Sequence, residues 1–279
     1  MKLLRFGEIG NEKPGILDTD GNIRDLSGHL TDINGDNLGE ESLNKIRNLD
    51  SSKLPLVGGQ PRLGTPVFGI SKLIAIGLNY ADHAEETNSP IPTEPIVFMK
   101  AISSITGPND IVVLPKNSTK SDWEVELAFV IGAKTKNVSK DDAMDHVAGY
   151  TICNDVSERE WQLEHGSQWS KGKSFDTFAP IGPWLVTKDE IKNPHELPMW
   201  LNLNGKPMQK GNTNTMIFNI PEIISYLSVF VTLHPGDVIT TGTPPGVGMG
   251  IKPEPIFLSH GDEMHLGIQG LGEQRQVVK

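Results

Sequence analysis

The sequence predicts a β-rich α+β fold, a sandwich or a rolled sheet with few helices. Many short apolar runs bounded by turn residues have the length and pattern of strands, and few segments have helical periodicity. Gly 29 plus Pro 20 make 49 of the 279 residues, about 18% against roughly 12% in average proteins. This excess indicates many turns and argues against a helical bundle.

The first segment predicts short strands, a hairpin and one helix. Residues 2–6 alternate weakly, and Asp20-Gly21-Asn22 is a hairpin signal before a returning strand at 23–26. Apolar residues three apart predict a helix over 40–49. The segment 55–66, rich in Pro and Gly, indicates a domain edge. Two domains are therefore predicted, 1–64 and 65–279, as the length also suggests.

The second segment predicts most of the strands. Residues 73–76 form an apolar run ending at Gly77 and predict a buried strand, which a short helix follows over 79–87. A second helix is predicted over 220–230, with Pro221 near its start. Asn204-Gly205 indicates a hairpin turn. Further strands are predicted at 96–99, 111–114, 123–131, 147–153, 183–186, 199–203, 238–241 and 264–268.

Charge and composition exclude several function classes. The net charge is −10, and no basic stretch is dense enough to neutralise a phosphate backbone, so we expect no nucleic-acid partner. Apolar runs stay far below the roughly 20 residues of a membrane helix, and the first ten residues contain no apolar leader. The single Cys153 excludes an internal disulfide. We expect a cytoplasmic protein without a membrane partner.

Three carboxylates have a pattern that fits a metal site. Alternate residues of a strand share a face about 7 Å apart, so Glu124 and Glu126 point the same way on an otherwise apolar strand. Asp155 ends the next apolar run along the chain, 148–153. Buried carboxylates are costly, and a hard dication offsets that cost. The alternative is an edge strand with one solvated face. No His or Cys pair has zinc-ligand spacing.

Two segments offer candidate acid–base and cationic groups. His83 and Glu86 are three apart on one helical face, the arrangement of a general base with its orienting carboxylate. Lys173 lies in a Gly-containing basic loop, and Lys100 ends an apolar strand. Either lysine would offset an anionic substrate. Solvated surface groups are the alternative for all four residues.

A Gly/Pro loop over 240–250 offers hydroxyls and free backbone N–H groups that suit a carboxylate. Its glycines have neither Walker nor dinucleotide spacing, so a stiff turn is the alternative. No serine lies in a G-x-S-x-G context, and Cys153 lies in an apolar strand, which argues against serine and cysteine nucleophiles.

Together these segments resemble the fumarylacetoacetate hydrolase family, in family order and over nearly all of residues 70 to 268. The resemblance implies a mixed β-sandwich roll behind a small N-terminal α+β domain, and a homodimer. The matching pieces are GLNYADHAEE (77–86), FMK (98–100), DWEVELAFVIG (122–132), GYTICNDVSERE (149–160), WSKGKSFDTFAPIGPW (169–184) and PGDVITTGTPPGVG (235–248).

The resemblance also implies a ligand set. It assigns Glu124, Glu126 and Asp155 to one Mg²⁺ or Mn²⁺ ion, with Ca²⁺ as a further candidate. The enzyme that names the family uses an additional upstream carboxylate, for which this chain has no secure counterpart, so the three-carboxylate site of shorter members is expected.

Catalytic and substrate-binding residues follow from the same resemblance. It places His83 and Glu86 on a lid helix as the dyad that activates water, and Lys173 beside the substrate. Lys100, Gln162 and Thr243 are implied as substrate contacts.

The implied substrates are 2-oxo acids. We expect hydrolysis of a C–C bond in a 2,4-dioxo acid, such as a 2,4-diketo-3-deoxy sugar acid related to fuconate or rhamnonate, to pyruvate and a hydroxy acid. Alternatives with the same site are ureidoglycolate lyase, oxaloacetate decarboxylase and 2-hydroxyhepta-2,4-diene-1,7-dioate isomerase. A catalytically inactive binding protein is the alternative of a different class.

Overall fold

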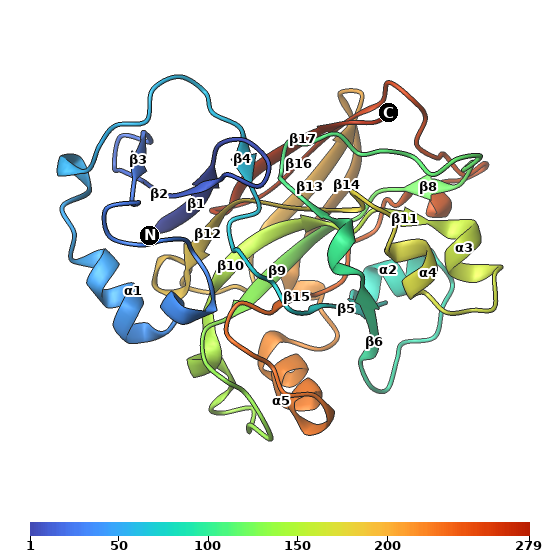
Figure 1. Ribbon diagram of the computed structural model, residues 1–279. Coiled ribbons are helices and arrows are strands. Elements are labelled where there is room, and N and C mark those ends of the chain that lie inside the picture. Colours follow the sequence, from blue (N-terminus) through green and yellow to red (C-terminus); the bar gives the residue numbers. More distant parts are fainter.

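The computed structural model describes all 279 residues and confirms the β-rich fold (Figure 1). A large sheet of 11 strands packs on a sheet of 4, and two short strands pair separately. In order, the large sheet contains β3 (Ile23–Asp25), β2 (Lys13–Leu17), β1 (Lys2–Phe6), β12 (Ala179–Thr187), β10 (Val147–Asn154), β9 (Val125–Ile131), β15 (Val238–Thr240), β5 (Leu73–Gly77) and β6 (Ile96–Lys100), with β4 (Leu63–Gly64) on β1 and β7 (Ile105–Thr106) on β12.

The smaller sheets complete the strands. The four-stranded sheet is formed by β14 (Lys206–Asn212), β13 (Pro198–Leu203), β16 (Glu263–Ile268) and β17 (Gly272–Val277), in that order. The isolated pair is β11 (Ser157–Glu158) with β8 (Ser121–Asp122). The turn predicted at Asn204-Gly205 joins β13 to β14 and is confirmed.

Five α-helices are short and lie outside the sheets. They are α1 (Glu40–Arg47), α2 (Ala81–Glu86), α3 (Arg159–Leu163), α4 (Ser170–Lys173) and α5 (Ile220–Phe230). In α5, a capping box between Asn219 and Glu222 satisfies the first backbone N–H groups, and Pro221 fits the first turn. None of the helices has the length and apolar character that a membrane crossing needs.

Strand β9 separates two apolar cores. Leu127 and Phe129 belong to the larger core, which β13 and β16 of the four-stranded sheet cover. Ala128 and Val130 point to the second core. The face that carries Glu126 is therefore opposite the sandwich interior.

The N-terminal segment continues the large sheet. Strand β1 pairs with β12 on one side and β2 on the other, and Leu43 of α1 lies in the second core with Val130 of β9. The predicted boundary at residue 64 stays a prediction.

Two local predictions were wrong. Residues 111–114 form no strand, because only Val112 makes a β-bridge, to Val278. The basic loop contains a short helix, α4, whose Gly172 lies so close to α3 that an added Cβ would be 2.5 Å from Gln162 N. A side chain there would separate the two helices.

Candidate metal centre

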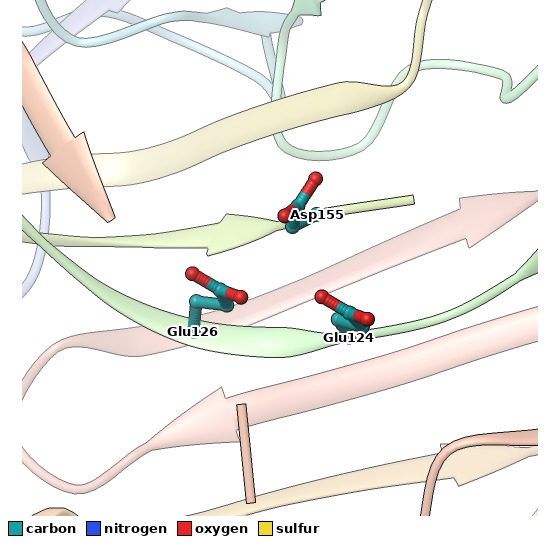
Figure 2. Close-up of side chains that lie close together, drawn as sticks. All are labelled: Glu124, Glu126 and Asp155. Atoms are coloured by element: carbon teal, nitrogen blue, oxygen red, sulfur yellow. The ribbon is translucent and has the colours of Figure 1, made fainter. Parts of the chain in front are cut away.

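Two adjacent antiparallel strands bring three carboxylates together. Glu124 directly precedes β9, Glu126 lies within it, and Asp155 directly follows β10. The register pairs Cys153 with Glu126, and the Asp155 N–H donates to Glu124 O at 2.9 Å. Candidate ligand oxygens of all three lie within 4.8 Å of one another, and the side chains converge in Figure 2. All three residues are buried.

Three cations hold two of these carboxylates, Glu124 and Asp155. Lys173 Nζ donates to Glu124 Oε2 at 2.7 Å and to Asp155 Oδ2 at 2.9 Å. Arg159 Nη1 lies 2.8 Å from Glu124 Oε1, and Lys100 Nζ donates to Asp155 Oδ1. Lys173 comes from α4 and Arg159 from α3, so the packing of these two helices sets the position of both cations.

The surroundings drive the pKa values of the two glutamates apart. Burial favours the protonated form of both. For Glu124 the Lys173 and Arg159 cations outweigh burial and lower the pKa to about 2. For Glu126 burial dominates, and the Asp155 and Glu124 carboxylates raise the pKa further above its usual 4.5.

Lys173 is a cation rather than a proton acceptor. Burial by itself would lower the pKa of Lys173, but the carboxylates of Asp155 and Glu124 outweigh it and raise that pKa. The group therefore supplies positive charge.

The residues present fit a hard divalent cation. Glu126 accepts only one backbone hydrogen bond, from Gly242 N at 2.9 Å, and no lysine or arginine pairs with it. Its burial next to two more carboxylates leaves excess negative charge that a dication would offset. Three carboxylates without a histidine or cysteine ligand suit Mg²⁺, Mn²⁺ or Ca²⁺ rather than zinc.

Helix α2 carries the predicted dyad. His83 Nδ1 lies 3.1 Å from Glu86 Oε2, and Glu86 Oε1 accepts from Gly246 N at 2.9 Å. This pairing leaves Nε2 as the free ring nitrogen. The His83 side chain is buried and lines the same cavity as the glutamates.

The cavity has a volume of about 210 Å³ and a charged floor. The floor is formed by buried residues, and the mouth by residues with exposed or half-exposed side chains. The floor contains Ile76, Gly77, His83, Phe98, Glu124, Glu126, Arg159, Gln162, Lys173, Gly242 and Thr243, and the mouth Leu78, Thr87, Ser89, Leu163, Trp169 and Met249.

The three predicted substrate contacts have different positions. Gln162 lines the cavity, and its Oε1 accepts from Arg159 at 2.9 Å, which leaves its amide N–H groups free. Thr243 also lines the cavity, but its hydroxyl donates to Val125 O and accepts from Gln209. Lys100 does not line the cavity: its ammonium lies behind Asp155 and also donates to Val156 O at 3.3 Å.

Sequence reasoning did not single out Arg159 or Asp122. Buried Asp122 accepts from Arg159 Nε at 2.8 Å and from Gly248 N and Met249 N, so it ties the Gly/Pro loop to the charged floor. Both residues lie in segments already quoted for the family resemblance. The one signal available in the sequence was that each is a charged residue a few positions from a predicted metal ligand, Glu124 or Asp155.

Comparisons with known proteins identify the family of this chain. The family model "Fumarylacetoacetate (FAA) hydrolase C-terminal" matches residues 72–279. A Burkholderia lata protein, provisionally called a hydrolase, is 60% identical over 279 residues, 100% of this chain and 99% of that protein.

Solved structures cover the full chain. Fumarylacetoacetate hydrolase from Exiguobacterium antarcticum is 35% identical with a TM-score of 0.86, over 100% of this chain and 99% of that one. Maleylpyruvate hydrolase from Sphingobium sp. SYK-6, in complex with manganese (II) ion and pyruvate, is 31% identical with a TM-score of 0.82, over 100% and 98%. 2-Hydroxyhepta-2,4-diene-1,7-dioate isomerase from Mycobacterium marinum is 32% identical with a TM-score of 0.76, over 100% and 98%. On this evidence of sequence, fold and family model, the chain belongs to the fumarylacetoacetate hydrolase family.

Proposed function

We propose that this protein is a divalent-metal-dependent hydrolase that cleaves a C–C bond of a 2,4-dioxo acid. Water adds to the C4 carbonyl, the C3–C4 bond breaks, and the products are pyruvate and a second carboxylic acid. The favoured substrates are 2,4-diketo-3-deoxy sugar acids, whose second product is a hydroxy acid. The observation that carries the proposal is one cavity that contains both an acidic triad and a histidine–glutamate dyad.

The acidic triad would hold the ion. Glu124, Glu126 and Asp155 are the residues that would bind Mg²⁺ or Mn²⁺, and the Sphingobium hydrolase contains manganese together with pyruvate. When bound, such an ion acts as a Lewis acid that polarises the 2-oxo carboxylate end of a substrate.

The dyad supplies the proton transfer. With the Nδ1–H of His83 donated to Glu86, Nε2 is the proton acceptor of the ring, and the His83 side chain lines the cavity. His83 Nε2 would take a proton from water as that water attacks C4, and return it to the departing three-carbon fragment. The Lys173 ammonium on the cavity floor stabilises the negative charge that develops on that fragment.

Tautomerisation of a dienol is the second candidate. The likeness to the Mycobacterium marinum isomerase over the full chain favours it. The same His83 Nε2 would move a proton between two carbons, and no C–C bond would break.

The test is pyruvate release from a panel of 2,4-dioxo acids with Mn²⁺, compared with EDTA and with Glu126→Gln. The panel contains the 2,4-diketo-3-deoxy derivatives of fuconate and rhamnonate and simple acylpyruvates. Pyruvate that disappears in both controls supports the proposal. If metal-loaded protein releases no pyruvate from any member but shifts the ultraviolet spectrum of a dienol, the isomerase replaces the hydrolase.

A further inference from the structure

The charges of the cavity are confined to its floor. Of the 17 residues that line it, only Arg159 and Lys173 are lysine or arginine, and both are buried. The mouth residues are uncharged: two leucines, a methionine, a tryptophan, a threonine and a serine. The end of a substrate that reaches the mouth therefore meets no cation.

The floor cations are already neutralised by protein carboxylates. Lys173 donates to Glu124 and Asp155, and Arg159 contacts Glu124 and Asp122, each at 2.7 to 2.9 Å. Neither cation can turn to a distant anionic group without leaving a buried carboxylate unpaired, which is costly.

The segment that contributes Leu78, Thr87 and Ser89 to the mouth provides no free cation. Residues 73–100 run from β5 through α2 to the end of β6, and their one lysine, Lys100, pairs with Asp155. A carboxylate on the distal end of a substrate would lose hydration at the mouth without gaining a cationic partner.

Neutral polar groups of a substrate have partners in the cavity. The Ser89 hydroxyl lies at the mouth, 3.1 Å from Thr87 Oγ1, and the Gln162 amide N–H groups on the floor are free. Hydroxyl groups on a substrate can pair with both side chains. Leu163 and Met249 supply apolar contact.

From this distribution we infer that the cavity selects 2,4-dioxo acids whose distal end is uncharged, and rejects dicarboxylates. The inference rests on the proposed function and narrows it. It sets this chain apart from two of its structural neighbours, whose names specify maleylpyruvate and a 1,7-dioate.

A matched pair of substrates tests the inference. One is a 2,4-dioxo acid that ends in a carboxylate, and the other is its primary amide, which has nearly the same shape and no distal charge. With Mn²⁺ present, kcat/KM for pyruvate release is expected to be at least about 10-fold higher for the amide. Equal values, or preference for the carboxylate, overturn the inference and leave the hydrolase proposal standing.

A substitution at the mouth provides the reciprocal test. The Leu163 side chain is partly exposed, so Leu163→Arg places a cation at the mouth without entering the core. We expect this variant to improve kcat/KM for the carboxylate by about 10-fold, while Leu163→Gln, the uncharged control, leaves the ratio of the two substrates unchanged. An unchanged ratio in Leu163→Arg contradicts the inference.

Binding separates the two proposals. Calorimetry with Mn²⁺-loaded His83→Ala measures the affinity for both compounds without turnover. Tighter binding of the amide with no pyruvate released by the unmodified protein supports the charge selection and refutes hydrolysis. If neither compound binds, both the inference about distal charge and the proposed substrate class are refuted.

Discussion

The two walls of the cavity are constructed differently. The strand wall, formed by β9, β10 and the residues that flank them, holds three buried carboxylates whose oxygens contact cations or a backbone N–H. The helix wall is α2, six residues long, whose N-cap Tyr80 makes no side-chain capping bond. It is tied to the rest of the protein through Glu86 to Gly246 N and through Asp82 to Thr215.

This difference separates two functions. Paired strands fix the ligand oxygens through the ladder that joins Gly149–Asn154 of β10 to β9, whereas a six-residue helix is unstable on its own and depends on its tertiary contacts. The structure therefore predicts that metal binding and proton transfer can be disrupted independently.

The largest expected effect is on the strand wall. Glu126→Gln keeps the shape of the side chain and removes one negatively charged ligand. Mn²⁺ affinity should therefore fall more than about 100-fold, beyond the 10–100-fold loss that is typical when a residue hydrogen-bonded to a metal ligand is substituted. Pyruvate release should fall to background. Titration calorimetry with Mn²⁺ measures the affinity, and Glu94→Gln, outside the cavity lining, is the control. Normal affinity in Glu126→Gln would remove this residue from the ligand set.

The next largest effect is expected from a substitution in the helix wall alone. His83→Ala removes the proton acceptor, and kcat should fall by about 10²- to 10⁴-fold. Mn²⁺ affinity should stay within a few-fold of normal, because His83 lies outside the triad. Glu85→Gln on the same helix is the matched control, since its side chain is exposed. Near-normal turnover in His83→Ala would refute the dyad.

The pH dependence of stability in the absence of metal tests the charge state of the strand wall. The folded state raises the pKa of Glu126 above its usual 4.5, so protonated Glu126 stabilises the fold at low pH. This contribution is lost as pH rises from about 4.5 through the raised pKa. In EDTA, the melting temperature should decline over that range relative to Glu126→Gln, which does not titrate there.

Added Mn²⁺ should reverse the decline, because the ion binds the deprotonated carboxylate. Parallel melting curves for the two proteins in EDTA would show that Glu126 keeps an ordinary pKa.

The smallest effect is expected at the end of β5, where Gly77 of the cavity floor contacts Trp169 of the mouth. At Gly77, an added Cβ would lie 2.2 Å from Trp169 Cζ3, and Trp169 in turn packs edge-on against Phe98. Gly77→Ala should displace the indole and cost about 1–3 kcal/mol of unfolding free energy, as overpacking usually does. Urea denaturation measures this cost. Gly58→Ala, where an added Cβ meets nothing, is the control.

Periodicity explains how much of the site could be predicted. The two-residue repeat of a strand predicts that Glu124 and Glu126 share a face, and the apolar run before Asp155 predicts that it lies at a strand end. The helical repeat predicts contact between His83 and Glu86, three residues apart, and the structure shows that contact. Each of these is a local relation along one element.

Relations between elements were not predictable in the same way. Lys100 was expected to contact the substrate. In the structure its ammonium donates to Asp155, and Lys100 is not among the residues that line the cavity. Arg159 and Asp122 were overlooked because a charged residue in a loop or short helix has no periodic signature. Residues 111–114 have the composition of a strand, but only Val112 finds a β-partner.

By itself, the sequence determined the β-rich fold class, the alternation of β9 and the candidate triad and dyad, because these follow from short-range geometry. Only the tertiary structure decided which cations neutralise which carboxylates, that Gly246 holds Glu86, and that the mouth of the cavity is uncharged. The physical reason is that ion pairing and cavity lining depend on distances between segments far apart in the chain, which sheet register and helix packing set.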